Sequence, residues 1–254
     1  MMIDINSDMG EGFGPYSIAD DAALMQLISS ANVACGYHAG DPVIMDRTIR
    51  LAKEHGVDLG AHVSYPDLMG FGRRRIDMAL PELECHILYQ LGALDGLARR
   101  AGHRITHVNP HGALGNLASV DAATAQSVAS ATMAFDPDIA VLVLPGSALE
   151  QAAEAMGGRC VRLFLADRAY NADGQLAPRN QAGAVIHDPK AVVARVIRVI
   201  ETSQIDTIGG QTIPMPVQSI LVHSDTAGAV DLAGRLRNAI AERGATLTPL
   251  SRQG

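Results

Sequence analysis

Residues 32–75 read NVACGYHAGDPVIMDRTIRLAKEHGVDLGAHVSYPDLMGFGRRR, and this stretch decides the fold class. Two short apolar runs, at 32–35 and 58–61, flank a segment whose apolar residues recur with helical spacing. The Asp–Pro pair at 41–42 is typical of a helix start, and a glycine then ends the pattern. The stretch therefore predicts a strand, a helix over 42–55 and a second strand.

The same alternation of apolar runs and helical segments continues along the chain. Repeated strand–helix units predict a parallel sheet with helices packed outside it. Because α/β barrels of this length commonly form one domain, we expect residues 1–254 to be a single domain with seven strands. The pattern alone leaves two alternatives open, a closed parallel β/α barrel and an open doubly wound sheet. The expected strands lie at 3–6, 32–35, 58–61, 107–109, 139–144, 161–165 and 219–222, and the expected helices at about 20–30, 42–55, 80–101, 121–134, 147–156, 189–201 and 226–243.

Two segments interrupt this alternation. Residues 168–187 are polar and punctuated by glycine and proline, and loops of this length in a compact domain are usually functional. Residues 204–218 contain TIGGQTIP, which predicts a hairpin insertion between short strands.

Composition excludes several classes of protein. The formal net charge is −7 and the basic residues form no long run, which argues against nucleic-acid and anionic-membrane partners. No stretch of about 20 apolar residues and no signal peptide are found, so we expect a cytoplasmic protein without a membrane span. The three cysteines are scattered, which disfavours a disulfide framework and a thiolate zinc site.

Ionisable side chains stand at the ends of most of the expected strands. In a parallel α/β domain the ligand site lies at the carboxyl ends of the strands, so these side chains should meet at one face. They are Asp8, His38, His62, His111, the pair Asp167 and Arg168, and the pair His223 and Asp225.

The strands also have one small or polar face and one mostly apolar face. Residues two apart share a face, and the polar faces carry Asn6 and Asn109. We expect the apolar faces to pack on the helices and the polar faces to line an interior. A polar interior in a chain with 48% hydrophobic residues indicates a cavity rather than a filled core.

The residues alone leave the chemistry of this face open. Asp8 with His38 and His62 would make a workable set of ligands for a divalent metal ion. The same groups could act as general base and general acid without a metal, since histidine titrates near neutral pH.

Two loops carry candidate anion sites. In GEGFGP, residues 10–15, the backbone amides of Gly10, Gly12 and Gly14 could hold a phosphate. In MGFGRRR, residues 69–75, Arg73 could bind a carboxylate through two hydrogen bonds.

Six motifs, taken together and in order, resemble those of the LamB/YcsF family, the A subunits of bacterial 5-oxoprolinase. They are DINSDMGEGFG, SANVACGYHAGDP, GAHVSYPDLMGFGRR, HVNPHGAL, FLADRAY and ILVHSD, and they span nearly the whole chain. The resemblance implies a seven-stranded β/α barrel related to the glycoside hydrolase and polysaccharide deacetylase superfamily. It also implies ATP-dependent opening of 5-oxoproline to L-glutamate in a complex with partner subunits B and C.

The resemblance also suggests roles for individual residues. ATP would activate the lactam, with Asp8 or His38 as base, His62 or His111 as acid, and Arg73 or Arg168 on anions. A bound divalent metal ion and a homo-oligomer both stay open. The implied catalytic residues are Asp8, His38, His62, His111 and Asp167; the substrate-binding residues are Asn6, Arg73, Asn109, Arg168, His223 and Asp225; the phosphate-binding residues are Gly10, Gly12 and Gly14.

The chain departs from the family pattern at four positions. Asn109 stands in place of lysine, Gly115 of tyrosine, Ser7 of cysteine and Ser224 of glycine. Losing the lysine removes a cation from the expected site, so the exact substrate stays open. The alternatives are a stand-alone metal-dependent amide hydrolase or deacetylase acting on a small N-acyl substrate, and a non-catalytic subunit that binds a small carboxylate.

Overall fold

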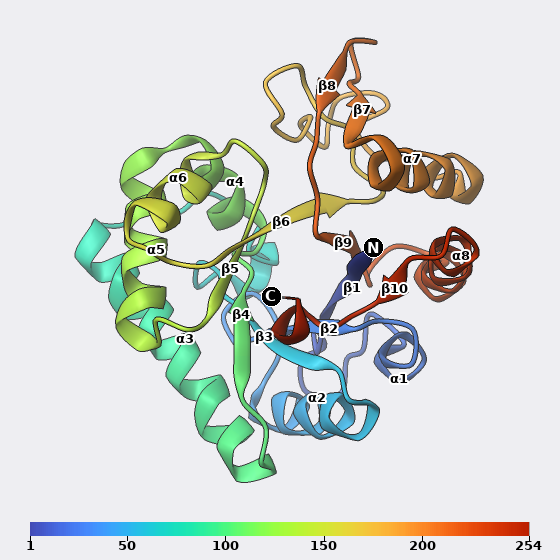
Figure 1. Ribbon diagram of the computed structural model, residues 1–254. Coiled ribbons are helices and arrows are strands. Elements are labelled where there is room, and N and C mark those ends of the chain that lie inside the picture. Colours follow the sequence, from blue (N-terminus) through green and yellow to red (C-terminus); the bar gives the residue numbers. More distant parts are fainter. Residues whose placement is uncertain (254) are drawn as a thin grey trace.

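The computed structural model describes residues 1–253 and contains a closed barrel of parallel strands (Figure 1). Strands β1, β2, β3, β4, β5, β6 and β9 pair in that order, and β9 pairs back onto β1. The seven-stranded barrel is therefore confirmed, and the open sheet is excluded. The barrel strands are β1 (Met2–Met9), β2 (Ser30–Ala34), β3 (Asp58–His62), β4 (Ile105–Val108), β5 (Ala140–Val143), β6 (Cys160–Leu165) and β9 (Ser219–Val222).

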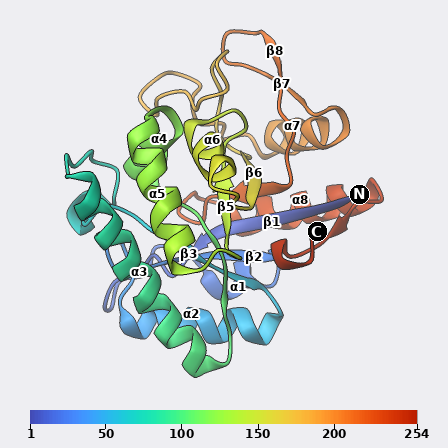
Figure 2. The same ribbon diagram turned by 60° about the vertical axis from the view of Figure 1, so that its left-hand side comes forward.

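Helices surround the barrel on its outer side, as the two ribbon views show (Figures 1 and 2). In the helix predicted over 42–55, the Asp41 side chain accepts hydrogen bonds from the first-turn amides, and Gly56 ends the helix with a φ of 66°. The helices are α1 (Asp21–Met25), α2 (Pro42–His55), α3 (Leu80–Ala101), α4 (Gly112–Val120), α5 (Ala122–Phe135), α6 (Ala148–Ala155), α7 (Pro189–Thr202) and α8 (Ala229–Glu242).

Three elements differ from the sequence-based expectation. The helix expected at 20–30 covers only α1, because the chain turns at Ser29, whose amide donates to the carbonyl of Ile5 in β1. Helix α4 was not expected, since its sequence GALGNLASV contains two glycines that weaken a helical pattern. A short strand, β10 (Thr246–Leu247), was also missed and pairs with the start of β1.

The middle of the barrel is filled by buried polar side chains. Asp4 accepts hydrogen bonds from Ser29 Oγ at 2.6 Å, from Ser30 Oγ at 2.7 Å and from Ser219 Oγ. Asn32 and His107, 2.9 Å apart between Oδ1 and Nε2, continue the network on neighbouring strands. The expectation of a cavity rather than a filled core is therefore wrong for this level of the barrel, because hydrogen-bonded side chains occupy it.

The two interrupting segments lie together beyond one end of the barrel, at the top of both ribbon views. Residues 204–214 form an antiparallel pair, β7 (Gln204–Asp206) and β8 (Thr212–Pro214). The amide of Ile208, in the turn of this hairpin, donates to the carbonyl of Tyr170 at 2.8 Å. Ile208 also packs against the alanines of the loop at 168–187, so the hairpin supports that loop.

Among residues 1–253, the structure contains no helix with the length and apolar character needed to cross a membrane.

Candidate active site

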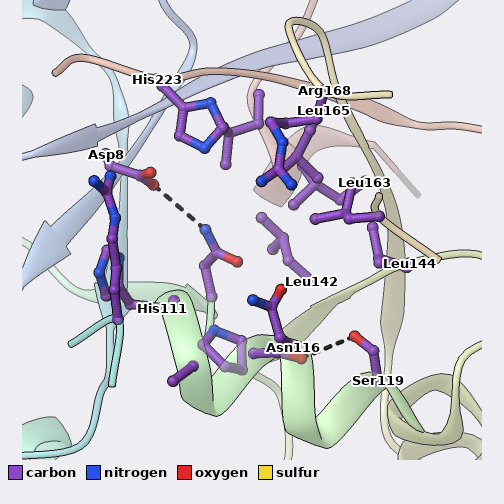
Figure 3. Close-up of a pocket in the computed structure, with 18 of the residues that line it drawn as sticks. Asp8, His111, Asn116, Ser119, Leu142, Leu144, Leu163, Leu165, Arg168 and His223 are labelled. Atoms are coloured by element: carbon purple, nitrogen blue, oxygen red, sulfur yellow. Dashed lines mark hydrogen bonds between the residues drawn. The ribbon is translucent and has the colours of Figure 1, made fainter. Parts of the chain in front are cut away.

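A cavity of about 470 Å³ lies at the carboxyl ends of the barrel strands. Figure 3 shows its two sides. Asp8, His111 and His223 lie around one part of it, and a group of leucines, with Arg168 beside Leu165, lies across from Asp8 and His111. These leucines are Leu142, Leu144, Leu163 and Leu165. The cavity can therefore hold a molecule with one polar and one apolar side.

Four neighbouring strands each deliver one side chain to a single cluster. Glu11 follows β1, His38 follows β2, His62 ends β3 and His111 follows β4. All four are buried, and one donor atom from each lies within 4.8 Å of the others. The convergence of the three predicted histidines is therefore observed.

Glu11 was missed by the sequence interpretation. It lies just beyond the end of β1 and is out of phase with Asp4, Asn6 and Asp8, the residues that the period-two pattern assigns to the polar face. The predicted metal set of Asp8, His38 and His62 stays a prediction, and Glu11 is a second candidate for its carboxylate. Asp8 lies 3.3 Å from His62 Nε2, but the structure groups Glu11, and not Asp8, with the three histidines.

The hydrogen bonds of two histidines determine which nitrogens face each other. His62 Nδ1 donates to the carbonyl of Asn109 at 2.8 Å, and His111 Nε2 donates to the carbonyl of Phe71 at 2.8 Å. The remaining nitrogens, His62 Nε2 and His111 Nδ1, lie 2.9 Å apart. Two lone pairs would repel at this distance, so one of these nitrogens must carry a proton.

His38 and Glu11 form a second pair within the cluster. His38 Nε2 lies 3.0 Å from Glu11 Oε1. His38 Nδ1 is buried and has no hydrogen-bond partner within residues 1–253. Unlike the other two histidines, His38 is therefore not anchored to a backbone carbonyl.

Burial and mutual charge set the protonation of this site. Burial raises the pKa of Glu11 to about 8, and the charge of Asp8 adds to this effect. Burial also lowers the pKa of His111 to about 3 and the pKa of His38 well below its usual value, and the neighbouring imidazoles add to both effects. Burial opposes the charged forms of His62 and Asp8 as well, but their attraction outweighs it, so the pKa of His62 is raised and that of Asp8 lowered. The shared proton therefore resides on His62.

The glycine-rich turn does not offer the predicted phosphate site. The amide of Gly10 donates to Asp21 at 3.1 Å, and that of Gly14 donates to Asp41 at 2.8 Å. Both amides are thus occupied by carboxylates, which would repel a phosphate. At Gly12 a Cβ would lie 2.5 Å from the carbonyl oxygen of Tyr16, so glycine is required here for a tight turn.

A second polar group lies elsewhere in the cavity wall. His223 Nδ1 lies 2.7 Å from Asp167 Oδ1, and His223 Nε2 lies 3.4 Å from Nη2 of Arg179. Arg73 forms a 2.6 Å ion pair with Asp225. Arg179 was not predicted, because its place depends on how the loop at 168–187 folds, and no strand pattern indicates that.

Arg168 donates hydrogen bonds to the backbone of the long loop, which the sequence did not indicate. It lines the cavity, but its Nη2 donates to the carbonyl of Ala177 at 2.6 Å and its Nε to that of Ala184 at 3.3 Å. Arg168 therefore holds the long loop in place from the cavity side.

The two predicted asparagines have different positions. Asn6 belongs to the polar network inside the barrel, donating to Ser219 Oγ at 2.6 Å, so its prediction as a substrate-binding residue is wrong. Asn109 lines the cavity, with Nδ2 3.5 Å from Asp8 Oδ1. At Gly115 a Cβ would meet the carbonyl oxygen of Pro110, so this backbone excludes a larger residue there.

Comparisons with known proteins agree with this architecture. A model of the LamB/YcsF family matches residues 3–254. A protein of Pseudomonas syringae pv. tomato, named as a 5-oxoprolinase A subunit, is 52% identical over 251 residues, which cover 99% of this chain and 98% of that protein. The crystal structure of a lactam utilization protein from Thermus thermophilus matches with a TM-score of 0.94 and 37% identity, covering 98% of this chain and all of that one. A peptidoglycan deacetylase of Bacillus subtilis matches with a TM-score of 0.50 at 13% identity, covering 99% and 88% of the two chains, and therefore shares the fold alone.

Proposed function

The chain belongs to the LamB/YcsF family, and we propose that it is the A subunit of an ATP-dependent 5-oxoprolinase. Its reaction would hydrolyse the lactam of 5-oxoproline to L-glutamate. The observation that carries this proposal is the 52% identity, over nearly the full length of both chains, to a protein named as a 5-oxoprolinase A subunit.

The two sides of the cavity suit this substrate. 5-Oxoproline has a carboxylate, an amide and a ring edge of two methylene groups. We assign the carboxylate to Arg179, and to Arg73 if the substrate displaces Asp225 from it; among the described residues, neither guanidinium group is anchored to a backbone carbonyl. The ring edge would face the leucines, where its burial is favourable.

Asp8 is the candidate proton carrier. It lines the cavity and is held in its ionised form by His62, whereas His38 does not line the cavity. Phosphorylation of the lactam oxygen by ATP would make the ring carbon electrophilic. Asp8 would take a proton from the attacking water and return it to the nitrogen as the carbon–nitrogen bond breaks. A second water would then release phosphate from the resulting acyl phosphate and leave glutamate.

The reaction would require the assembled complex. We propose that ATP is bound within a cytoplasmic complex of this chain with subunits B and C. The basis for the complex is that the relatives are named as subunits, which implies further chains.

The decisive experiment is an assay of glutamate release from 5-oxoproline by this chain mixed with its B and C partners. Release that requires ATP and all three proteins is the expected result. Release by this chain alone without ATP would favour a stand-alone hydrolase. No release from an assembled, ATP-hydrolysing complex would reject 5-oxoproline as the substrate.

A further inference from the structure

We propose that Glu11, His38, His62 and His111 bind one divalent transition-metal ion of the zinc type. This inference goes beyond the lactam reaction, because metal binding is measurable whether or not the chain acts on 5-oxoproline. Its starting point is the cluster in which four adjacent strands each contribute one buried side chain.

The dimensions of the cluster match those of a metal coordination sphere. Tetrahedral zinc with ligand bonds of about 2.0–2.1 Å holds its ligand atoms about 3.3–3.4 Å apart. Glu11 Oε1 lies 3.0 Å from His38 Nε2, 3.7 Å from His111 Nδ1 and 3.9 Å from His62 Nε2. All four donor atoms lie within 4.8 Å of one another. The rings of His38 and His111 are stacked with their centroids 3.8 Å apart, so they would have to tilt for both nitrogens to point at one ion.

The histidines are oriented as metal ligands usually are. A ligating histidine typically donates its second ring N–H to a carbonyl or carboxylate, which fixes the tautomer. The backbone carbonyls of Asn109 and Phe71 serve His62 and His111 in this way, each at 2.8 Å. The nitrogens that remain face the cluster and share one proton, whose place a metal ion would take.

The backbone around the cluster is held in a conformation that is costly without a function. Phe71, whose carbonyl orients His111, has a φ of 54°, which is unfavourable for a residue other than glycine. His38 Nδ1 is buried without a partner in the described chain, and such a group is also costly. Strained and unsatisfied groups of this kind concentrate at functional sites.

Asp8 remains outside the ligand set and inside the cavity. Its carboxylate contacts His62 and accepts a hydrogen bond from Asn32 Nδ2 at 3.0 Å, whereas Glu11 contacts all three histidines. A bound ion would supply Lewis acidity to a carbonyl oxygen or to water at the cavity wall. Asp8 is then free to move the proton, as the proposed function requires.

Metal content tests the inference directly. The full chain is stripped with a chelator, reloaded with Zn²⁺ or Co²⁺, and analysed by mass spectrometry of the metal and by Co²⁺ absorption. We expect one ion per chain and cobalt bands of a nitrogen–oxygen site. Loss of a group that only orients a ligand costs about 10–100-fold in metal affinity. Glu11→Gln, His38→Ala and His111→Ala each remove a direct ligand and should weaken Zn²⁺ binding by at least that much, whereas Asp8→Asn should keep one ion.

The controls separate this site from adventitious binding. His187→Ala removes an exposed histidine and should leave the metal content unchanged. Circular dichroism reports whether each variant is folded, and the isosteric Glu11→Gln carries the test if an alanine variant unfolds. Failure of the wild-type chain to bind a stoichiometric ion, or one ion per chain in Glu11→Gln and His111→Ala, would overturn the proposal. Loss of the ion in Asp8→Asn with retention in Glu11→Gln would show that the ligand set is wrong.

Discussion

His223 Nδ1 lies 2.7 Å from Asp167 Oδ1, and this contact determines which nitrogen of His223 faces Arg179. A guanidinium group only donates hydrogen bonds, so His223 Nε2, 3.4 Å from Arg179 Nη2, must accept. The ring hydrogen is then on Nδ1 and is donated to Asp167. The three side chains thus form one chain of contacts that ends at the proposed carboxylate site.

Replacing Asp167 with asparagine should disturb this chain of contacts while preserving the shape of the site. An asparagine amide can donate to His223 Nδ1, which moves the ring hydrogen to Nε2 and sets it against the guanidinium. Loss of a charged hydrogen bond costs about 1.5–3 kcal/mol, so we expect kcat/KM in the complex to fall about 10–100-fold. Asp173→Asn, an exposed change in the same loop, is the matched control. Equal activity of both variants would contradict this role of Asp167.

Arg179→Gln should act on substrate binding. If Arg179 binds the substrate carboxylate, its loss should raise KM for 5-oxoproline about 10–100-fold and change kcat much less. Steady-state kinetics of the complex at saturating ATP measure both constants. Arg104→Gln is the control, because it replaces an exposed arginine, and it should change neither kcat nor KM. An unchanged KM in Arg179→Gln would remove this residue from the carboxylate site.

Gly72→Ala should damage the histidine cluster through a steric clash. A Cβ at Gly72 would lie 2.7 Å from His111 Cδ2 and 2.8 Å from His38 Cβ, and would also meet Ser64 Oγ. The φ of 63° adds backbone strain of about 1–2 kcal/mol. We therefore expect activity to fall at least about tenfold, together with a lower thermal midpoint.

Gly210→Ala separates the effect of backbone strain from that of the steric clash with the histidines. Gly210 has a φ of 81° in the hairpin turn, but open space surrounds the position of its Cβ. This variant should have a lower thermal midpoint of unfolding than the wild type and normal activity. If both alanine variants behave alike, backbone strain alone explains the effect, and the contact with the histidines is unimportant.

The sequence predicted those parts of the site that depend on strand geometry. His38, His62 and His111 could be brought together because each follows a strand whose direction and face are set by the alternation of apolar and polar residues. Glu11 could not be predicted, because it is out of phase with the polar face of its strand. Arg179 could not be predicted either, because it lies in the long loop at 168–187, whose course is fixed by tertiary contacts. The supposed phosphate loop failed for a related reason: Asp21 and Asp41, which occupy its amides, approach only when the chain has folded.

The interior of the barrel shows a further limit of predicting structure from the alternation of polar and apolar residues. The alternation correctly placed polar residues inside, but it could not distinguish a cavity from a hydrogen-bonded core. At Gly60 a Cβ would collide with the ring of His107, so the absence of a side chain on β3 is matched by a large one on β4. Such complementarity between strands is visible only in three dimensions.

Asp4 should make the stability of the protein depend on pH. Burial raises the pKa of Asp4 from 3.8 to about 6, despite hydrogen bonds from serine hydroxyls. The folded state therefore holds the proton more tightly than the unfolded state, so the contribution of Asp4 is most favourable below pH 3.8 and is lost as the pH rises to about 6. A shift of about two units corresponds to about 3 kcal/mol.

Asp4→Asn removes this titration and retains an acceptor for the serines. The free energy of unfolding of the variant, minus that of the wild type, should increase by up to about 3 kcal/mol between pH 4 and pH 6.5 and stay constant above. Urea denaturation across this range measures the difference, which also cancels the titration of all other groups. A difference for Asp4→Asn that does not change with pH would mean that the Asp4 carboxyl titrates alike in the folded and unfolded chain, and that its burial costs nothing at neutral pH.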